Sequence, residues 1–283
     1  MTSRADFHVH TTASDGRLTP TDLVELAVQR GLDILAVTDH DSTEGIVEAL
    51  AAAAKHPGFT LVPGIEMSTD IPGDEIHVLG FFLDYKDVEF QRTLTMLRGA
   101  RRDRGRSMVE KLHAMGIDIP WQRVEELADG GAVGRPHVAQ ALIEKGYVST
   151  FQEAFDRYIG RNGPAYVDRV KLTPVEAIEI LVGAGALAVL AHPSSLTKLD
   201  EMLEQFKAAG MVGMEVYYQD YDRNTCGRLA AAAERHGLLK LGGSDFHGMG
   251  TERERQPGDI PLPDEAIDAF MAKASQMTSS RHS

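Results

Sequence analysis

Short apolar runs alternate with longer amphipathic stretches along most of the chain. Seven of these runs predict β-strands, at residues 6–9, 34–38, 60–62, 76–82, 188–191, 213–217 and 238–242. Helical patterns follow most of them, at residues 21–30, 43–55, 174–184, 200–209 and 223–236. This alternation indicates parallel strands joined by crossover helices. The sequence therefore predicts a barrel-like α/β fold, one strand short of the usual eight.

The alternation stops between about residues 88 and 170. This stretch has a helical pattern throughout, at residues 89–115, 121–127, 137–145 and 150–158, with glycine and proline at its joints. We interpret residues 88–170 as a helical subdomain inserted into a barrel that is formed by residues 1–87 and 171–275. We expect residues 276–283 to form a disordered tail.

The composition is that of an ordinary globular protein. Of the 283 residues, 43% are hydrophobic and 25% are charged, so a core of normal size is available without metal. Cys226 is the only cysteine, which excludes an intrachain disulfide and suits a reducing compartment. The sequence contains neither a signal-peptide pattern nor an apolar run of about 18 residues. We therefore expect a cytoplasmic protein without membrane contact and infer no obligate protein partner.

The charge of the chain restricts its partners. A net charge of −13 disfavours binding of nucleic acid through a broad basic face. It still permits a small anionic substrate, because bound divalent cations reverse the sign of a pocket. One basic run stands out, and we favour a solvated helix face over a ligand-steering patch for it. It comprises Arg98, Arg101, Arg102, Arg104 and Arg106.

Polar side chains gather where the first two predicted strands end. His8 and His10 leave the first strand on the same face, so both imidazoles can reach one ion. Asp15 follows in a Ser-Asp-Gly turn. A lone His-x-His pair is weak evidence, since two surface histidines would have the same spacing.

The second strand is followed by Asp39, His40 and Asp41, at the end where a barrel displays catalytic groups. We expect Asp41 or Ser42 to be the N-cap of the next helix, which leaves Asp39 and His40 for the site.

Four further strands carry potential metal ligands. These are Glu66, His77, His192, and the pair Asp245 and His247. Six of the seven predicted strands thus end on or carry His, Asp or Glu, and a barrel brings strand ends to one rim. Imidazoles and carboxylates together suit Zn, Mn or Fe better than Mg or Ca alone. The ligands are too many for one four-coordinate ion, so we expect two or three ions.

The remaining histidines differ in context. We assign no role to those in or beside helices or in the tail, which are His56, His113, His236 and His282. His137 follows Gly134-Arg135-Pro136 at a predicted helix start. Arg135 is either an incidental residue of this helix-start signal or a bidentate fork for phosphate near a helix N-terminus.

Taken together, these motifs resemble a known family, the PHP (polymerase and histidinol phosphatase) family. The motifs are His8-Val9-His10, Asp15, Thr38-Asp39-His40-Asp41, Gly64-Ile65-Glu66, His77, Ala191-His192-Pro193 and Asp245-Phe246-His247, in the expected order from residue 6 to about 250. The helical insertion with Gly134-Arg135-Pro136-His137 resembles the stand-alone bacterial members, which include 3′,5′-nucleotide bisphosphate phosphatases. The resemblance implies a distorted seven-stranded (β/α) barrel with an inserted helical subdomain and a cluster of two or three metals.

The resemblance also implies a set of metal ligands. The first ion would be held by His8, His10, Glu66 and Asp245, the second by Asp15, His40 and His247, and the third by Glu66, His77 and His192. The family uses different metals in different members, and we expect manganese here, with iron or zinc as alternatives.

The expected reaction follows from this site, because no serine or cysteine nucleophile with a paired base is evident. A water that bridges two ions loses a proton near neutral pH and attacks phosphorus in line. We expect Asp15, His192 and Arg135 to act in catalysis, and Arg135, His137 and Ser194 to bind substrate. His192 and His137 are both candidates for the general acid.

The expected substrate is a nucleoside 3′,5′-bisphosphate that loses its 3′-phosphate. The metals would take one phosphoryl group, and Arg135 with Arg161-Asn162-Gly163 would hold the second. Three alternatives remain. They are a 5′-3′ exonuclease acting on short oligonucleotide ends, a phosphatase for histidinol phosphate or another small phosphate, and a non-catalytic binding domain stabilised by metal.

Overall fold

All seven predicted strands are present and form one sheet in chain order. The computed structural model describes residues 4–71, 74–168, 172–219, 221–250 and 254–281. The strands are β1 (Ala5–Val9), β2 (Ile34–Val37), β3 (Thr60–Ile71), β4 (Asp74–Phe81), β5 (Leu187–Leu190), β6 (Gly213–Tyr218) and β7 (Leu239–Gly243). The His10 amide donates to Phe246 O at 2.9 Å and the Asp245 amide donates to His8 O at 2.8 Å. These bonds join β1 to the end of β7, so the sheet nearly closes, and the predicted α/β barrel is confirmed.

One strand breaks the expected parallel order. β4 runs antiparallel to both β3 and β5, so the prediction of parallel strands throughout is wrong at this point. Only residues 72 and 73 separate β3 from β4, which is too few for the crossover that parallel strands need. β3 is also longer than the predicted residues 60–62, because it continues through a more polar segment as far as Ile71. Its register pairs Ser68 with His77, so these two side chains lie on one face.

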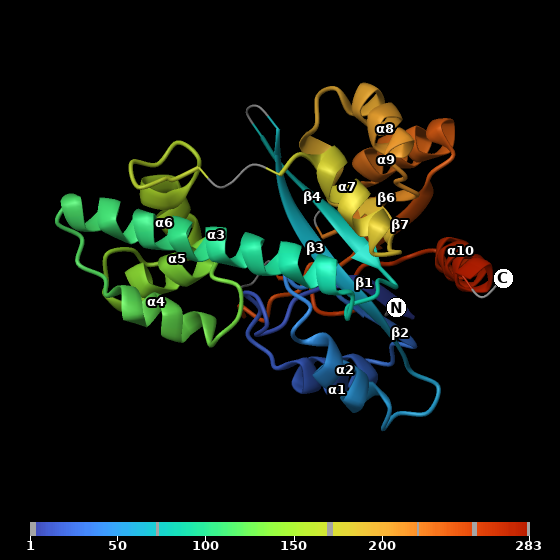
Figure 1. Ribbon diagram of the computed structural model, residues 1–283, viewed down its shortest axis with the longest axis horizontal. Helices are drawn as coiled ribbons and strands as arrows, with labels where there is room; N and C mark the ends of the chain where they lie inside the picture. The colour runs from blue at the N-terminus through green and yellow to red at the C-terminus, as the bar shows by residue number, and fades with distance from the viewer. Residues whose placement is uncertain (1–3, 72–73, 169–171, 220, 251–253, 282–283) are drawn as a thin grey trace.

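Helices cover the outside of the barrel (Figure 1). α1 (Pro20–Gln29) and α2 (Ile46–Ala53) pack beside β1 and β2, while α7 (Pro174–Gly183), α8 (Leu199–Ala208) and α9 (Arg223–His236) cover another side. None of the helices in the described part of the chain has the length and apolarity to cross a membrane.

A C-terminal helix closes one end of the barrel. In α10 (Asp264–Arg281), the Phe270 ring centroid lies 5.0 Å from that of Phe7 and 5.2 Å from that of Phe81. The helix continues to Arg281, so the expectation of a disordered tail from residue 276 is wrong up to that point. Apolar residues at helical spacing, Ile267, Phe270 and Ala274, are buried against the barrel and order the helix. Residues 282 and 283 of the expected tail lie outside the described residues.

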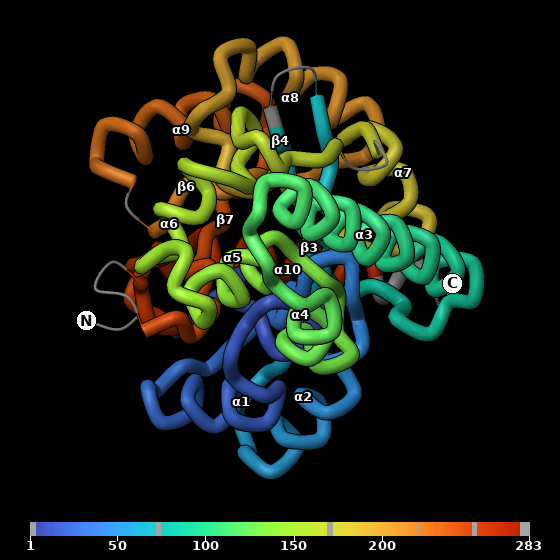
Figure 2. Tube along the Cα trace, turned by 90° about the vertical axis from the view of Figure 1, so that its left-hand side faces the viewer, coloured from blue at the N-terminus to red at the C-terminus, as the bar shows by residue number. Residues whose placement is uncertain are grey.

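The stretch from residue 88 to 159 is helical, as predicted. It contains α3 (Val88–Ala114), α4 (Trp121–Ala128), α5 (Arg135–Glu144), α6 (Phe151–Ala154) and the π-helix η1 (Phe155–Ile159). The first half of α3 packs on the barrel through Phe90 and Leu94, and its second half joins a separate core through Val109 and Leu112. Seen from the side of this segment, its helices lie in front of the barrel (Figure 2). The predicted boundary at residues 170 and 171 lies outside the described residues.

Candidate metal centre

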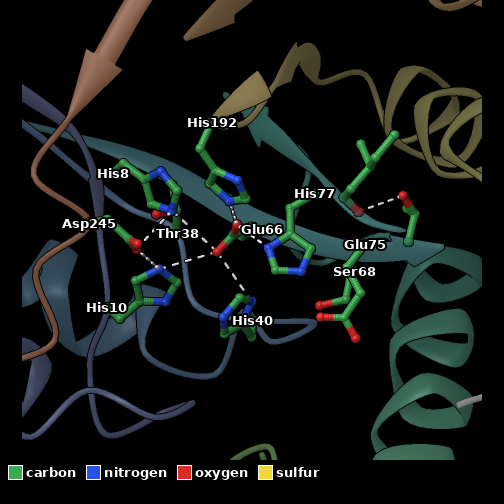
Figure 3. Close-up of polar contacts among 12 residues, drawn as sticks. His8, His10, Thr38, His40, Glu66, Ser68, Glu75, His77, His192 and Asp245 are labelled. Atoms are coloured by element: carbon green, nitrogen blue, oxygen red, sulfur yellow. Dashed lines mark hydrogen bonds and ion pairs between the residues drawn. The ribbon is translucent and has the colours of Figure 1, made fainter. Parts of the chain in front are cut away.

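A single carboxylate lies at the centre of the site. Glu66 is 1% exposed and stands in the middle of β3, not at its end. Five imidazoles surround it, as Figure 3 shows. Its Oε2 atom lies 3.2 Å from a ring nitrogen of His8, His10 and His40, and its Oε1 atom lies 2.7 Å from His77 Nδ1 and 3.1 Å from His192 Nε2. The alternation of β1 explains the first pair, because His8 and His10 point inward while Val9 packs in the core.

Two further carboxylates complete the cluster. Asp245 Oδ1 lies 3.0 Å from His10 Nε2 and 3.3 Å from His8 Nε2. Asp15 faces the other side of His10, with its Oδ1 atom 3.4 Å from His247 Nε2. Its Oδ2 atom lies 3.8 Å from His40 Nε2. The structure thus brings together all nine side chains that the sequence suggested as ligands.

The side chains form three overlapping groups that could each hold an ion. The groups are His8, His10, Glu66 and Asp245; His10, Asp15, His40 and His247; and His40, Glu66 and His77. The first is the set that the resemblance implied. The second gains His10, and the third contains His40 in place of His192, which contacts the cluster through Glu66.

The donor set fits transition-metal ions. Two ligands bound tetrahedrally at about 2.1 Å lie roughly 3.4 Å from each other. The imidazole–carboxylate distances in the cluster, 2.7 to 3.8 Å, span that value. Within the described part of the chain, both ring nitrogens of His10 and Nδ1 of His40 are buried and make no hydrogen bond of good geometry, although carboxylate oxygens lie as close as 3.0 Å. Such atoms are costly to bury unless something binds them.

The electrostatics of the cluster also favour cations. Burial lowers the pKa of His10, but its contacts with Asp245 and Glu66 outweigh burial and raise the pKa to about 10. The negative charge of these carboxylates therefore favours a protonated His10 imidazole when no metal cation neutralises that charge. Burial, together with the charges of His10 and Arg101, lowers the pKa of His40 to about 3. His40 is thus in the neutral form that binds metals.

The strand β6 supplies support for the cluster that the sequence analysis missed. Glu215 is fully buried, its Oε1 lies 3.1 Å from His8 Nδ1, and its Oε2 accepts the His192 amide at 2.8 Å. Tyr218 donates its hydroxyl proton to Asp245 Oδ2 at 2.6 Å. Such outer contacts orient metal ligands and fix the tautomer of an imidazole. The available signal was a single acidic residue inside the otherwise apolar run 213–217.

Two of these residues have unusual backbone conformations. His192 has φ of 30° and Asp245 has φ of 51°, both in the left-handed region that non-glycine residues seldom occupy. The Glu215 carboxylate holds the His192 amide, and the Asp245 amide bonds to the backbone of His8. This strain at two candidate ligands is typical of a functional site.

Asp39, which we expected to be free for the site, has a structural role. Its Oδ1 accepts the Thr11 amide at 2.8 Å and the Ser14 hydroxyl at 2.6 Å, and its Oδ2 accepts the Thr11 hydroxyl at 2.7 Å. These bonds hold the loop that carries Asp15. The prediction for Asp39 is therefore wrong, because three neighbouring donors use its carboxylate.

Asp41 and Ser42 are not the helix cap that we predicted. The N-cap of α2 is Gly45, without a side-chain hydrogen bond. The Asp41 carboxylate instead accepts the Ser68 amide at 3.0 Å and forms an ion pair with Arg101. It therefore links the barrel to α3.

The basic run on α3 is divided between two environments. Arg102 and Arg106 are 63% and 67% exposed, as a solvated face requires. Arg98, Arg101 and Arg104 are only 20%, 13% and 9% exposed, so the favoured interpretation is wrong for them. Their side of the long helix faces the barrel.

The start of α5 lies against the cluster. A Cβ atom built on Gly134 would be 3.6 Å from Asp15 Oδ2 and 3.8 Å from Arg101 Nη1. His137 Nδ1 accepts the Gly134 amide at 2.9 Å, so its Nε2 carries the proton of the neutral ring. Burial lowers the pKa of His137, which favours that neutral form.

The other expected substrate contacts differ in their surroundings. Arg135 donates through Nη2 to Glu75 Oε2 at 2.6 Å, and its guanidinium lies 5.2 Å from the centroid of the Phe155 ring. The Ser194 amide donates to the Tyr221 hydroxyl at 3.1 Å. The roles of Arg135, His137 and Ser194 in binding substrate stay predictions.

A nearly closed α/β barrel that gathers nine imidazoles and carboxylates at one end defines a metal-dependent hydrolase. The PHP domain model matches residues 6–160. The 3′,5′-nucleoside bisphosphate phosphatase of Chromobacterium violaceum is 34% identical over 87% of this chain and 87% of its own length. The chain belongs to the PHP domain family and is a metal-dependent phosphoesterase. The resemblance drawn from the motifs is thereby confirmed.

Other relatives carry a different name. The 5′-3′ exoribonuclease Rnm of Escherichia coli is 36% identical over 86% of this chain and 84% of its own length. A solved structure of a Bifidobacterium adolescentis protein, described as a metal-dependent phosphoesterase, is 32% identical to this chain. The two structures superpose with a TM-score of 0.86 over 95% of each chain.

Proposed function

We propose that this protein hydrolyses the 3′-phosphate of nucleoside 3′,5′-bisphosphates, giving the 5′-monophosphate and phosphate. The observation that carries the proposal is the position of Arg101 and the start of α5, which adjoin Asp15 in the metal cluster. Cationic and amide groups of the helical insertion thus lie beside the place where a phosphoryl group would react. A substrate with two phosphates can bind the metal cluster with one phosphate and the groups of the insertion with the other.

The first anchor is the barrel rim. The ions are expected to bind the nine clustered side chains. Eight of them form the three geometric groups, in which Glu66, His10 and His40 are each shared by two, and His192 contacts Glu66. When bound, such ions neutralise phosphoryl oxygens and activate a water for attack in line. Glu215 and Tyr218 keep His8 and Asp245 oriented for that task.

The second anchor is a set of arginines on the insertion that faces acidic side chains of the β3–β4 hairpin. Arg135 lies 2.6 Å from Glu75, and Arg161 lies 3.5 Å from Asp70. A phosphate can exchange with these carboxylates, because Arg135 contacts Glu75 through one nitrogen and its planar fork suits phosphate bidentately. His137 can donate from Nε2 to an oxygen between the two anchors.

A second candidate function, 5′-3′ exoribonuclease activity, is favoured by the relatives of that name at similar identity. Both reactions act on a nucleotide that carries a 5′-phosphate, and both break the bond between its 3′-oxygen and phosphorus. They differ in whether the reacting phosphate is terminal or links a second nucleotide. The net charge of −13 favours the smaller substrate.

The test measures release of phosphate and nucleotides in the presence of Mn²⁺. The substrates are adenosine 3′,5′-bisphosphate, 3′-AMP, 5′-AMP, histidinol phosphate and a short 5′-phosphorylated oligoribonucleotide. The proposal expects kcat/KM for the bisphosphate to exceed that for 3′-AMP by at least about tenfold, because a charge-assisted contact contributes about 1.5–3 kcal/mol. Equal values, or a preference for histidinol phosphate, would overturn it. Preferred release of 5′-mononucleotides from the oligonucleotide would establish the second candidate.

A further inference from the structure

A cavity of about 250 Å³ lies between the Asp15 loop and the helical insertion. Leu127, Phe151 and Met249 give it an apolar wall. Its polar side chains are Thr12, Asp15, Arg17, His137 and Gln140. Asp15 belongs both to this cavity and to the metal cluster. A molecule with its phosphoryl group at the cluster can therefore extend into the cavity without a gap.

The cavity contains surfaces suited to a flat ring. Phe151 is half-buried at the start of α6, and the Arg17 guanidinium lies 5.8 Å from the centroid of its ring. Arg17 is held in place by hydrogen bonds to the Gln140 side chain and to Met249 Sδ. An aromatic ring and a planar guanidinium are the groups on which proteins stack nucleobases.

The lining also disfavours a second phosphate in this cavity. A second phosphate would meet the Asp15 carboxylate and apolar walls, with Arg17 as the lining cation. An aromatic and aliphatic wall from Phe151, Leu127 and Met249 beside polar side chains suits a planar heteroaromatic molecule.

We propose that this cavity binds the nucleobase of the substrate, with Phe151 as its stacking surface. The inference rests on the proposed function, since it assumes a nucleotide whose 3′-phosphate lies at the metal cluster. The second phosphate stays with Arg135, on the side of the insertion that faces Glu75. Recognition by stacking tolerates different bases, because each base has a π-face. The Gln140 carbonyl, already bound to Arg17, contributes little base selectivity.

The experiment compares two substrates in three proteins. The substrates are adenosine 3′,5′-bisphosphate and its abasic analogue, in which hydrogen replaces adenine. The proteins are the wild type, Phe151→Ala and Phe151→Leu, where leucine keeps bulk without a ring. Tyr147→Ala, on the same insertion outside the cavity, serves as the matched control. The melting temperature of each variant shows whether it folds.

In the wild type we expect the adenine to raise kcat/KM at least about fivefold over the abasic analogue, mainly through KM. Phe151→Ala should remove most of that advantage, Phe151→Leu part of it, and Tyr147→Ala none. An equal loss on both substrates in the Phe151 variants would show a structural role and overturn the nucleobase site. A wild type that hydrolyses both bisphosphates equally well would overturn it too, while the proposed function stands. A wild type that hydrolyses neither would remove the proposed function and this inference with it.

Discussion

Replacing Glu215 tests how the barrel holds its candidate ligands. The two carboxylate oxygens of Glu215 have different tasks, one facing His8 Nδ1 at 3.1 Å and the other accepting the His192 amide at 2.8 Å. His8 points its Nε2 atom at the cluster, so its Nδ1 atom must donate to Glu215. Glu215→Gln keeps the size of the side chain but has one acceptor oxygen, so one of these two donors then faces an amide NH₂.

The size of the effect follows from this loss. Leaving a buried donor unsatisfied costs about 1–3 kcal/mol, and outer contacts of metal ligands contribute about tenfold to a hundredfold in metal affinity or activity. We therefore expect Glu215→Gln to weaken Mn²⁺ binding by about tenfold to a hundredfold. Activity at saturating metal should recover in part, because the ligands themselves remain.

The assay is a Mn²⁺ titration of phosphoesterase activity, with the melting temperature as a check on folding. The matched control is Glu204→Gln, an exposed residue of α8 that removes the same charge. If Glu215→Gln and Glu204→Gln have the same metal dependence as the wild type, the role assigned to β6 is refuted. A loss of kcat that no metal concentration reverses would place Glu215 in the reaction itself.

Two other substitutions separate the remaining roles. Asp15→Asn should lower turnover by at least roughly a hundredfold, because it perturbs a candidate ligand between His40 and His247. His56→Ala, at a half-buried pair with Glu25, should stay near the wild type. Similar rates for the two variants would contradict the ligand assignment. Arg135→Lys should have a lower kcat/KM for bisphosphates than the wild type, since a point charge cannot reproduce the guanidinium fork. Wild-type kcat/KM in Arg135→Lys would return Arg135 to the helix-start role.

The barrel was predictable because its signals are local. Each strand is a short apolar run, and the histidines at or after β1, β2, β5 and β7 follow such runs directly. The direction of β4 was missed because the pattern of a strand does not indicate whether it pairs parallel or antiparallel. The second half of β3 is polar and was not recognised as strand, so the link to β4 looked longer than it is. No helix was predicted at residues 264–281, and a disordered tail was expected from residue 276, because the packing of Phe270 against the barrel cannot be read from the local pattern.

The candidate ligands could be found from spacing, but their support could not. The bonds of Asp39 to Thr11 and of Glu215 to His8 and His192 join residues far apart in sequence. From the sequence alone, an Asp that follows a strand can equally be a helix cap or a site residue. Only the folded chain shows which hydrogen-bond donors surround its carboxylate. The buried side of α3, with Arg101, was missed for the same reason, since a long basic helix has no local sign that it crosses a barrel rim.

Metal stoichiometry tests the central claim most directly. The protein is to be stripped with a chelator and titrated with Mn²⁺, while bound metal is measured by elemental analysis and activity is measured on adenosine 3′,5′-bisphosphate. Three overlapping ligand groups, two of which contain Glu66, predict that activity is lost on stripping and returns only as at least two equivalents bind. Full activity with one equivalent or fewer would contradict the multinuclear site.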